Sequence, residues 1–386
     1  MKILTRGAAL DWLQSFPKPK FGAPVGANVI VQGRNRPNSV VCDISFFPAP
    51  LPPENFDVVG VRDTDSHFLH GYGFPADDRC TTVALLAQFD SSTRTVPEIS
   101  PAWLQRHIHD KCTTGNQRKP IALSSGYRLL DGVEDGVPGL TVDVASPRFA
   151  LLRSRSLAAD CITPFVANSL VMSGAEEIAV EHSSGTSHVL QFWRPLDRFV
   201  VEFGNRVHWD QLRRHPQCMP FPFAQHRLDS IRKSAARTVC VVGDDVGGWS
   251  MGLALTASRV CSVTHNASNV RDTAAVNFGL EAVRSHPVFA WSELRNLCLG
   301  LTFDVAAIVV GEKSNTVDWF IDLLRVLRPS QRVFVMAWEV DSAADPFAQA
   351  LETFEFNIVL TKSLGLSDPR AKCWWIEAVH RRTATC

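Results

Sequence analysis

Several patterns that mark common classes of protein are missing from this sequence of 386 residues. No apolar run approaches the roughly 18 residues that a membrane-spanning helix needs, so no membrane partner is predicted. No two of the ten cysteines stand at CxxC spacing, and HExxH does not occur, so no metal site is predicted. The cysteines are interpreted as reduced thiols scattered through a soluble intracellular protein.

An excess of charge of either sign is also missing. Lys and Arg together number 39, and Asp and Glu also number 39. Without a global basic field, any contact with nucleic acid has to come from local patches. The first 42 residues are acid-poor, with Asp11 against six basic residues, which fits either an organelle-targeting segment or an RNA-binding face. Those basic residues are Lys2, Arg6, Lys18, Lys20, Arg34 and Arg36.

The length suits two or three domains. Residues 1–92 contain short apolar runs, such as 28–31 and 40–42, between turns rich in Gly, Pro and Asn, which predicts a small β-barrel. Within it, residues 70–75 are predicted to be a cluster of turns and residues 81–89 a strand. Residues 93–118 are predicted to hold one helix and a linker, with Ser100 as N-cap and Pro101 in the first turn.

Residues 119–215 are predicted to form a mixed α/β domain. A strand at 127–130 leads into tight turns at Asp131-Gly132, Asp135-Gly136 and Pro138-Gly139. Residues 140–144 alternate like a strand with one buried face, and 149–152 can pair with them. Residues 158–172 have the spacing of a helix, and residues 177–180 and 189–193 are predicted to be further strands.

Residues 216–386 are predicted to form a Rossmann-like sheet. The apolar run 238–242 is typical of a buried parallel strand, and it leads into Gly243, Gly247 and Gly248 and then into a helix. Further strands are predicted at 260–263, 304–310 and 333–337, alternating with helices at 269–278 and 317–327. This repeat predicts a doubly wound sheet that would bind a ligand at the carboxyl ends of its strands.

Residues 125–144 read SGYRLLDGVEDGVPGLTVDV. This string resembles the hairpin that opens the central domain of the PUA-containing, S-adenosylmethionine-dependent methyltransferases acting on cytosine C5 of large-subunit ribosomal RNA. Their hairpin reads close to YRL-x-GE-x-DG-x-PGL-x-VD. The resemblance implies a multidomain α/β protein with an N-terminal PUA-like barrel, a central mixed α/β domain and a C-terminal Rossmann-like methyltransferase sheet, in the order of the boundaries above.

The sequence departs from that family at the cofactor site. The glycine turn remains as Gly243, Gly247 and Gly248, but Asp244 and Asp245 stand where the family has small or aromatic residues. Two carboxylates there would repel the carboxylate of S-adenosylmethionine. The family's ribose-binding acid falls on His265, whose neutral ring offers one acceptor. The three glycines and His265 are therefore predicted to be vestiges of a cofactor site, and no cofactor is expected. The turn is not GxGxxG, which argues against a nicotinamide dinucleotide.

The residues of the family's reaction are missing as well. The family's Lys-Thr-Gly and Asp-Gln-Arg motifs fall on residues 218–220 and 224–226, where only Gln225 agrees. No Asp-Pro-Pro follows residues 303–305. The cysteine that should attack C6 of cytosine is absent from residues 335–339, which read VMAWE, although covalent catalysis needs a thiolate there. No catalytic residue is therefore assigned, and the balance is against an enzyme.

The leading hypothesis is a pseudo-methyltransferase that binds ribosomal RNA, as an assembly factor or structural component of the ribosome. The mitochondrial ribosome is expected, with ribosomal or assembly-factor proteins as further partners. Two alternatives stay open: a divergent but active S-adenosylmethionine-dependent rRNA methyltransferase, and a protein-interaction module without direct RNA contact. Candidate RNA contacts are Arg34, Arg36, Arg213, Arg214, Arg227, Arg232 and Lys233.

Overall fold

The computed structural model describes the chain as two compact units. Unit 1 comprises residues 1–119 and 127–196, and unit 2 comprises residues 120–126 and 197–386. The described residues are 2–16, 18–21, 25–30, 41–43, 57–63, 69–75, 82–89, 100–115, 126–195, 197–202, 204–214, 230–231, 234, 236–254, 257–278, 287–293, 302–310, 317–340, 345–363 and 372–383. The division into domains at residues 92, 118 and 215 stays a prediction.

One sheet of unit 1 has six strands in the order β2-β5-β3-β4-β7-β6, in which β5 also pairs with β6. Strands β5, β3, β4, β7 and β6 pair in that order, and the second pairing of β5 joins the last of these strands, β6, to the first. The bounds are Lys20–Phe21 for β2, Val25–Ile30 for β3, Val41–Asp43 for β4, Asp57–Asp63 for β5, Leu69–Pro75 for β6 and Thr82–Gln88 for β7. The predicted strand at 81–89 is confirmed by β7.

The predicted cluster of turns at residues 70–75 is wrong, because these residues form β6. Gly71 and Gly73 lie so close to β7 that a Cβ atom would sit 2.0 Å from the carbonyl oxygen of Ala87 and 2.2 Å from that of Ala84. The glycines therefore serve close packing of two strands instead of a change of chain direction. Tyr72 and Phe74, which alternate with them, are buried.

The second sheet of unit 1 has the order β1-β12-β11-β10-β9-β8. Its strands span Lys2–Thr5 (β1), Tyr127–Asp131 (β8), Leu140–Ser146 (β9), Phe149–Ser154 (β10), Glu177–Glu181 (β11) and Ser187–Gln191 (β12). Strands β8 to β12 overlap the strands predicted at 127–130, 140–144, 149–152, 177–180 and 189–193. The sequence did not predict β1, which pairs in parallel with β12 at the edge of this sheet, with Lys2 opposite His188.

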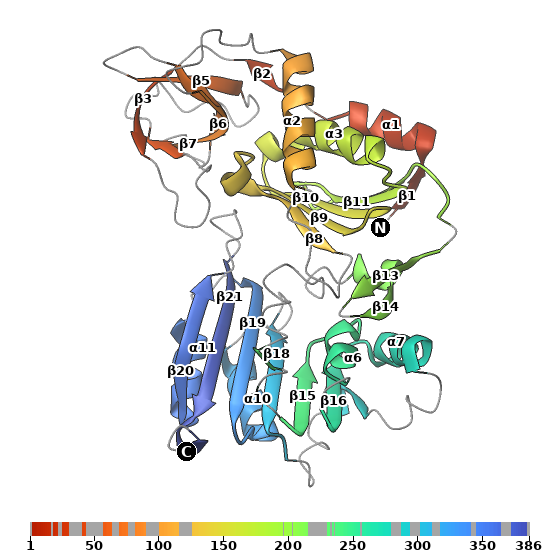
Figure 1. Ribbon diagram of the computed structural model, residues 1–386, viewed down its shortest axis with the longest axis vertical. Helices are drawn as coiled ribbons and strands as arrows, with labels where there is room; N and C mark the ends of the chain where they lie inside the picture. Colours follow the sequence, from red (N-terminus) through yellow and green to blue (C-terminus); the bar gives the residue numbers. More distant parts are fainter. Residues whose placement is uncertain are drawn as a thin grey trace. The chain divides into compact units, whose positions relative to one another are not determined.

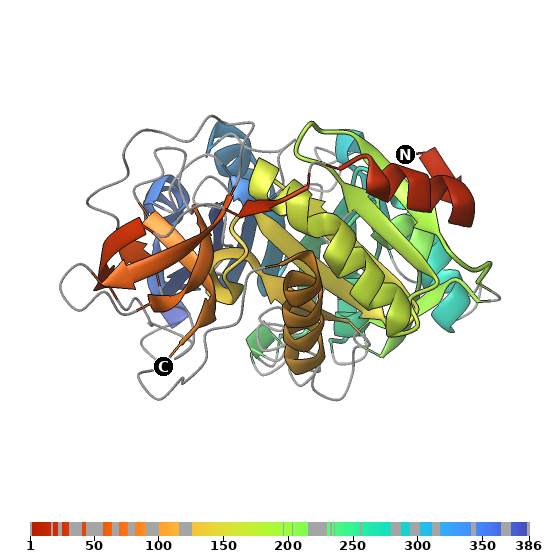
Figure 2. The same cartoon turned by 90° about the horizontal axis from the view of Figure 1, so that it is seen from above.

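Three helices cover one face of this sheet: α1 (Arg6–Gln14), α2 (Pro101–Gly115) and α3 (Leu157–Met172), as Figures 1 and 2 show. Helix α2 begins where predicted, since the backbone N–H of Trp103 donates to Oγ of Ser100 at 3.2 Å. Helix α3 is capped in the same way by Ser156. The two sheets of unit 1 share one apolar core, which includes Phe74, Leu86, Leu104 and Val142.

Unit 2 opens with a hairpin of β13 (Phe199–Glu202) and β14 (Asn205–His208) and the short helix α4 (Trp209–Leu212). A seven-stranded sheet follows, in the order β17-β16-β15-β18-β19-β21-β20. Its strands span Thr238–Val242 (β15), Arg259–Thr264 (β16), Val288–Ala290 (β17), Val305–Val310 (β18), Arg332–Val340 (β19), Phe356–Ser363 (β20) and Lys372–His380 (β21). All neighbours from β17 to β19 are parallel, whereas β21 is antiparallel to both β19 and β20.

Among the described residues of unit 2, four helices alternate with these strands: α6 (Gly248–Ala254), α7 (Ala267–Phe278), α10 (Val317–Leu327) and α11 (Asp345–Thr353). Helices α10 and α11 share the main core with alternate residues of the strands, such as Cys240, Val242 and Ile308. Helices α6 and α7 contribute Met251 and Val270 to a separate, smaller core. The predicted doubly wound sheet is confirmed. Within the described residues, no helix is both long and apolar enough to cross a membrane.

Candidate functional site

The loop after β15 lies where the strand order of the sheet reverses. From β15 the chain runs outward through β16 to β17, and it returns to the opposite side of β15 with β18. In open α/β sheets, ligands bind at this crevice, beyond the carboxyl ends of the strands. Residues 243–248 and the residues that follow β16 and β17 therefore form the candidate site, and all of it belongs to unit 2.

Asp244 occupies the centre of the loop, and its side chain is fully buried. Its Oδ1 accepts the backbone N–H of Gly247 at 2.9 Å, and its Oδ2 accepts the backbone N–H of Ser250 at 2.8 Å and the Ser250 hydroxyl at 2.9 Å. The carboxylate thus caps the first turn of α6 and uses donors that a bound ligand would otherwise meet.

Asp245 reaches from the same loop to the end of β16. Its Oδ1 accepts the hydroxyl of Thr264 at 2.6 Å and the backbone N–H of His265 at 2.9 Å. Its backbone oxygen accepts the side-chain amide of Asn269, in α7, at 3.2 Å. A carboxylate therefore stands at the end of β16 after all, but it comes from a different loop and is 7% exposed.

At two of the three glycine positions, the backbone conformation and the close neighbouring atoms require glycine. Gly243 has a φ of 80°, and a Cβ atom there would lie 2.3 Å from the carbonyl oxygen of Val309 in β18. Gly247 has a φ of 90° and faces Val270 and Thr273 of α7. Gly248 is the first residue of α6. The glycine turn predicted from the sequence is thus retained by close packing of the loop against β18 and α7.

Three aromatic rings stack beside this loop. The exposed ring of His265 lies 5.2 Å from that of Trp291, at an interplanar angle of 27°. Trp291 in turn lies 4.8 Å from Trp319, at 24°. The rings come from the ends of β16 and β17 and from the first turn of α10. We call these residues the aromatic stack. It places flat apolar surface at the same edge of the sheet as Asp245.

Comparison with solved structures identifies the fold. A protein from Streptococcus mutans, provisionally classed as a SAM-dependent methyltransferase, matches 98% of this chain and 100% of its own at a TM-score of 0.57 and 15% identity. The chain has the fold of SAM-dependent methyltransferases. A second match, a provisionally assigned methyltransferase complexed with S-adenosylhomocysteine (SAH), has the same coverage, identity and TM-score. No protein-family model and no curated protein matches the sequence.

The residues at the site do not fit S-adenosylmethionine (SAM) well. A ribose with two hydroxyls is best bound by a carboxylate whose oxygens both accept hydrogen bonds from it. Here β16 ends in Thr264 and His265, and one oxygen of Asp245 is already bonded to both residues. The N–H of Gly247 is bonded to Asp244, and the aromatic stack lies alongside. These donors and acceptors are therefore already used within the protein.

The hairpin that resembles the rRNA methyltransferases is held together by buried charges. Arg128 donates through Nε to Oδ1 of Asp143 at 2.7 Å and through one terminal nitrogen to Asp131 at 2.9 Å. Arg153 also donates to Asp143, and the backbone N–H of Asp131 donates to Asp135. Burial alone would lower the pKa of Arg128, but Asp143 and Asp131 raise it above its ordinary value. These charged motif residues thus stabilise the central sheet.

Most of the candidate RNA contacts are not described by the structure. Arg34, Arg36, Arg227, Arg232 and Lys233 lie outside the described residues. Arg213 has a side chain that is 5% exposed and bonded to Asp210, which Arg198 also contacts. Arg214 is exposed. Of the described candidates, Arg214 is therefore the better placed to meet a phosphate.

No group of three or more His, Cys, Asp or Glu residues able to hold a metal ion occurs in the described part of the chain. Residues 335–339, where the resemblance would place the nucleophilic cysteine, lie in strand β19 (Arg332–Val340). The sequence analysis missed the aromatic stack and the bonds between Asp245 and the end of β16. A usable signal was present, since His265 and Trp291 each directly follow a strand of a parallel sheet, and such strands share one carboxyl edge.

Proposed function

We propose that the chain is a pseudo-methyltransferase that binds ribosomal RNA, as an assembly factor or a lasting structural component of the ribosome. The proposed setting is the mitochondrial ribosome, with ribosomal or assembly-factor proteins as further partners. The observation that carries the proposal is the hydrogen bonding of Asp244 and Asp245, which satisfies the loop after β15 from within the protein. A loop built for SAM would leave its donors for the ligand.

The RNA-binding part of the proposal rests on other features. The hairpin at residues 125–144 resembles that of rRNA methyltransferases, and the likeness to the Streptococcus mutans structure extends over 98% of this chain. The second pairing of β5, with β6, supports a PUA-like barrel as the N-terminal element. These features support a protein that retains the domains expected to contact RNA, although its cofactor site differs from that of an active methyltransferase.

The cofactor half of the proposal predicts that SAM does not bind at physiological concentration. Loss of a charged acceptor for the ribose removes on the order of 1.5–3 kcal/mol. That loss corresponds to roughly one to two decades of affinity. Isothermal titration calorimetry with SAM and SAH should therefore show no saturable binding. A micromolar Kd would overturn the proposal in favour of a divergent, active methyltransferase.

Two variants separate the causes of this expected weakness. Trp291→Ala shortens the aromatic stack but adds no acceptor, so it should bind SAM no better than the wild type does. His265→Asp adds an acid at the end of β16 but places it beside Asp245, so binding should again stay undetectable. If Trp291→Ala alone restored micromolar binding of SAM, the aromatic stack would be what prevents binding. The missing ribose-binding acid would then not be the cause.

The RNA half is tested by ultraviolet crosslinking in cells, followed by sequencing of the RNA bound to the tagged full chain. Ribosomal RNA should be enriched over messenger and transfer RNA. Co-purification of ribosomal proteins without any crosslinked RNA would contradict RNA binding and support the protein-interaction alternative. The cofactor titration and the crosslinking fail independently, so either half of the proposal can be rejected alone.

A further inference from the structure

A cavity of about 540 Å³ lies in unit 1 between α1, α3 and the start of α2. This volume is within the range of small-molecule sites, roughly 300–1,000 Å³. Most of the lining is apolar, and Leu13, Phe16 and Phe192 are buried, whereas Leu10 is 46% exposed. The cavity is remote in sequence from residues 243–265, and the methyltransferase fold of unit 2 does not account for it.

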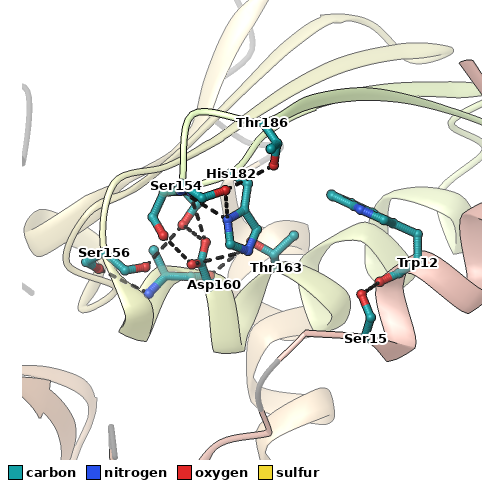
Figure 3. Close-up of polar contacts among 11 residues, drawn as sticks. Trp12, Ser15, Ser154, Ser156, Asp160, Thr163, His182 and Thr186 are labelled. Carbon is teal, nitrogen blue, oxygen red and sulfur yellow. Dashed lines mark hydrogen bonds and ion pairs between the residues drawn. The ribbon is translucent and has the colours of Figure 1, made fainter. Parts of the chain in front are cut away.

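The wall that α1 provides is anchored. Trp12 and Phe16 pack against the ring of His182, with centroid distances of 6.5 Å and 4.9 Å. Nε2 of His182 lies 3.3 Å from Oδ2 of Asp160, a fully buried carboxylate in α3 that also accepts from the hydroxyls of Ser154 and Ser183. Figure 3 shows this network beside α1. Because α1 is tied to α3 and to the β11–β12 turn, the space between the helices is built into unit 1.

The charged side chains that line the cavity are all positive. Arg6 and Lys18 are its charged residues, and no described lining residue is an acid. Pro101, the first residue of the 15-residue helix α2, also lines the cavity, so the positive end of a helix dipole lies there. Burial, with a contribution from the charge of Asp160, raises the pKa of the lining thiol Cys161 to about 11, so it stays neutral at pH 7. The cavity therefore combines an apolar interior with cationic groups.

We propose that this cavity binds a single-chain anionic amphiphile, with its acyl chain among Leu10, Phe16, Phe165 and Phe192 and its carboxylate or phosphate between Arg6 and Lys18. Apolar burial supplies affinity in proportion to the area removed from water. The two cations select the sign of the headgroup, and both carboxylate and phosphate suit them. The guanidinium of Arg6 lies 5.1 Å from the ring centroid of the exposed Trp193, so it already stands at the surface beside the cavity.

Isothermal titration calorimetry on the full chain tests this with defined probes below their micelle concentrations. Dodecanoate and dodecyl phosphate should each saturate one site per chain, and the stronger of the two identifies the headgroup. Dodecyltrimethylammonium should bind at least tenfold more weakly. Acetate and inorganic phosphate should not bind, because they lack the chain. Equal binding of the cationic and anionic amphiphiles, or no saturable binding of either anion, would overturn the proposal.

Variants locate the site. Arg6→Glu with Lys18→Glu should weaken dodecanoate binding at least tenfold, whereas Arg106→Glu, which reverses an exposed charge of α2 outside the lining, should leave it unchanged. Leu10→Trp keeps every charge and fills the cavity from an exposed position, so it should abolish binding while the melting temperature stays near that of the wild type. Wild-type affinity in Leu10→Trp would refute the site, as would binding to anionic vesicles without binding of monomeric dodecanoate.

Discussion

The role that the sequence predicts for Asp244 differs from the role that this residue has in the structure. In the sequence, two adjacent carboxylates after β15 predict repulsion of an anionic ligand. In the structure, the Asp244 carboxylate is buried and accepts three hydrogen bonds from Gly247 and Ser250. The sequence could not predict this role, because it depends on where α6 begins and on which donors its first turn presents.

Replacing Asp244 therefore has a defined cost at the residue scale. Asp244→Ala leaves two backbone N–H groups and one hydroxyl without their acceptor, which should lower the free energy of unfolding by about 2 kcal/mol or more. Urea denaturation followed by circular dichroism measures this. Asp322→Ala on the exposed face of α10 is the control and should stay within about 0.5 kcal/mol of the wild type. A similarly small effect of Asp244→Ala would contradict the capping role.

The same residue predicts a dependence on pH. Burial raises the pKa of Asp244 above its ordinary 3.8, hydrogen bonds from Ser250 and Gly247 oppose this, and the charge of Asp245 adds to the rise. A carboxyl whose pKa is higher in the folded state than in the unfolded state adds to the free energy of unfolding. This contribution is fully present below the unfolded pKa, and it is lost as the pH rises through the folded pKa. Asp244→Asn should therefore destabilise more at about pH 4 than at about pH 7. An equal loss of the free energy of unfolding in Asp244→Asn at both pH values would exclude a raised pKa of Asp244.

At the scale of elements, the sequence predicts best where the pattern is local. Helix α2 begins at the predicted cap, and α3, β8 to β11 and the strands β15, β16 and β18 lie within a few residues of their predicted ranges. Among the elements that were missed, β1 pairs with β12, which is distant in sequence. The periodicity of β1, four residues long, carries too little information, because only Leu4 of its four residues is buried.

The turn of the hairpin motif supplies a prediction at this scale. Gly136 has a φ of 77°, and a Cβ atom there would lie 2.2 Å from the carbonyl oxygen of Leu85 in β7. Gly185 has a similar φ of 80° but nothing within 4 Å. Gly185→Ala should thus cost only the backbone strain, about 1–2 kcal/mol, and Gly136→Ala should cost clearly more, because backbone must also move. Urea denaturation of both variants gives the difference, and equal costs would show that the approach to β7 is not tight.

At the scale of the whole molecule, the neutral net charge means that the proposed RNA binding would depend on local patches of basic residues. Affinity for ribosomal RNA should fall steeply with salt, because each neutralised phosphate releases counterions. Arg34→Glu with Arg36→Glu should weaken binding and reduce the salt slope by about 2, one for each phosphate that no longer meets an arginine. Filter binding across a salt series measures both. Arg106→Glu with Arg325→Glu, two exposed cations outside the candidate set, is the matched control.

An unchanged affinity in the Arg34 and Arg36 variant would place the RNA-binding face elsewhere on the molecule. Replacing Asp244 and Asp245 by Ala is not a suitable control, because both carboxylates hold the loop after β15 together. The location of the candidate site followed from sequence, since a glycine turn after a buried strand marks the carboxyl edge of a parallel sheet. Its contents were not predicted. The strands before His265 and Trp291 could have placed both residues at this edge, whereas Trp319, in the first turn of α10, is brought beside them only by the fold.

The pairing of β1 with β12 has a consequence for the order in which the protein is made. Lys2 leaves the translating ribosome long before His188, its partner in the sheet. Until β12 is synthesised, β1 has no edge to join, while β8 to β11 can already pair with one another through short connections. Docking of β1 and α1 should thus be a late step of co-translational folding, and it completes the helical layer over the central sheet.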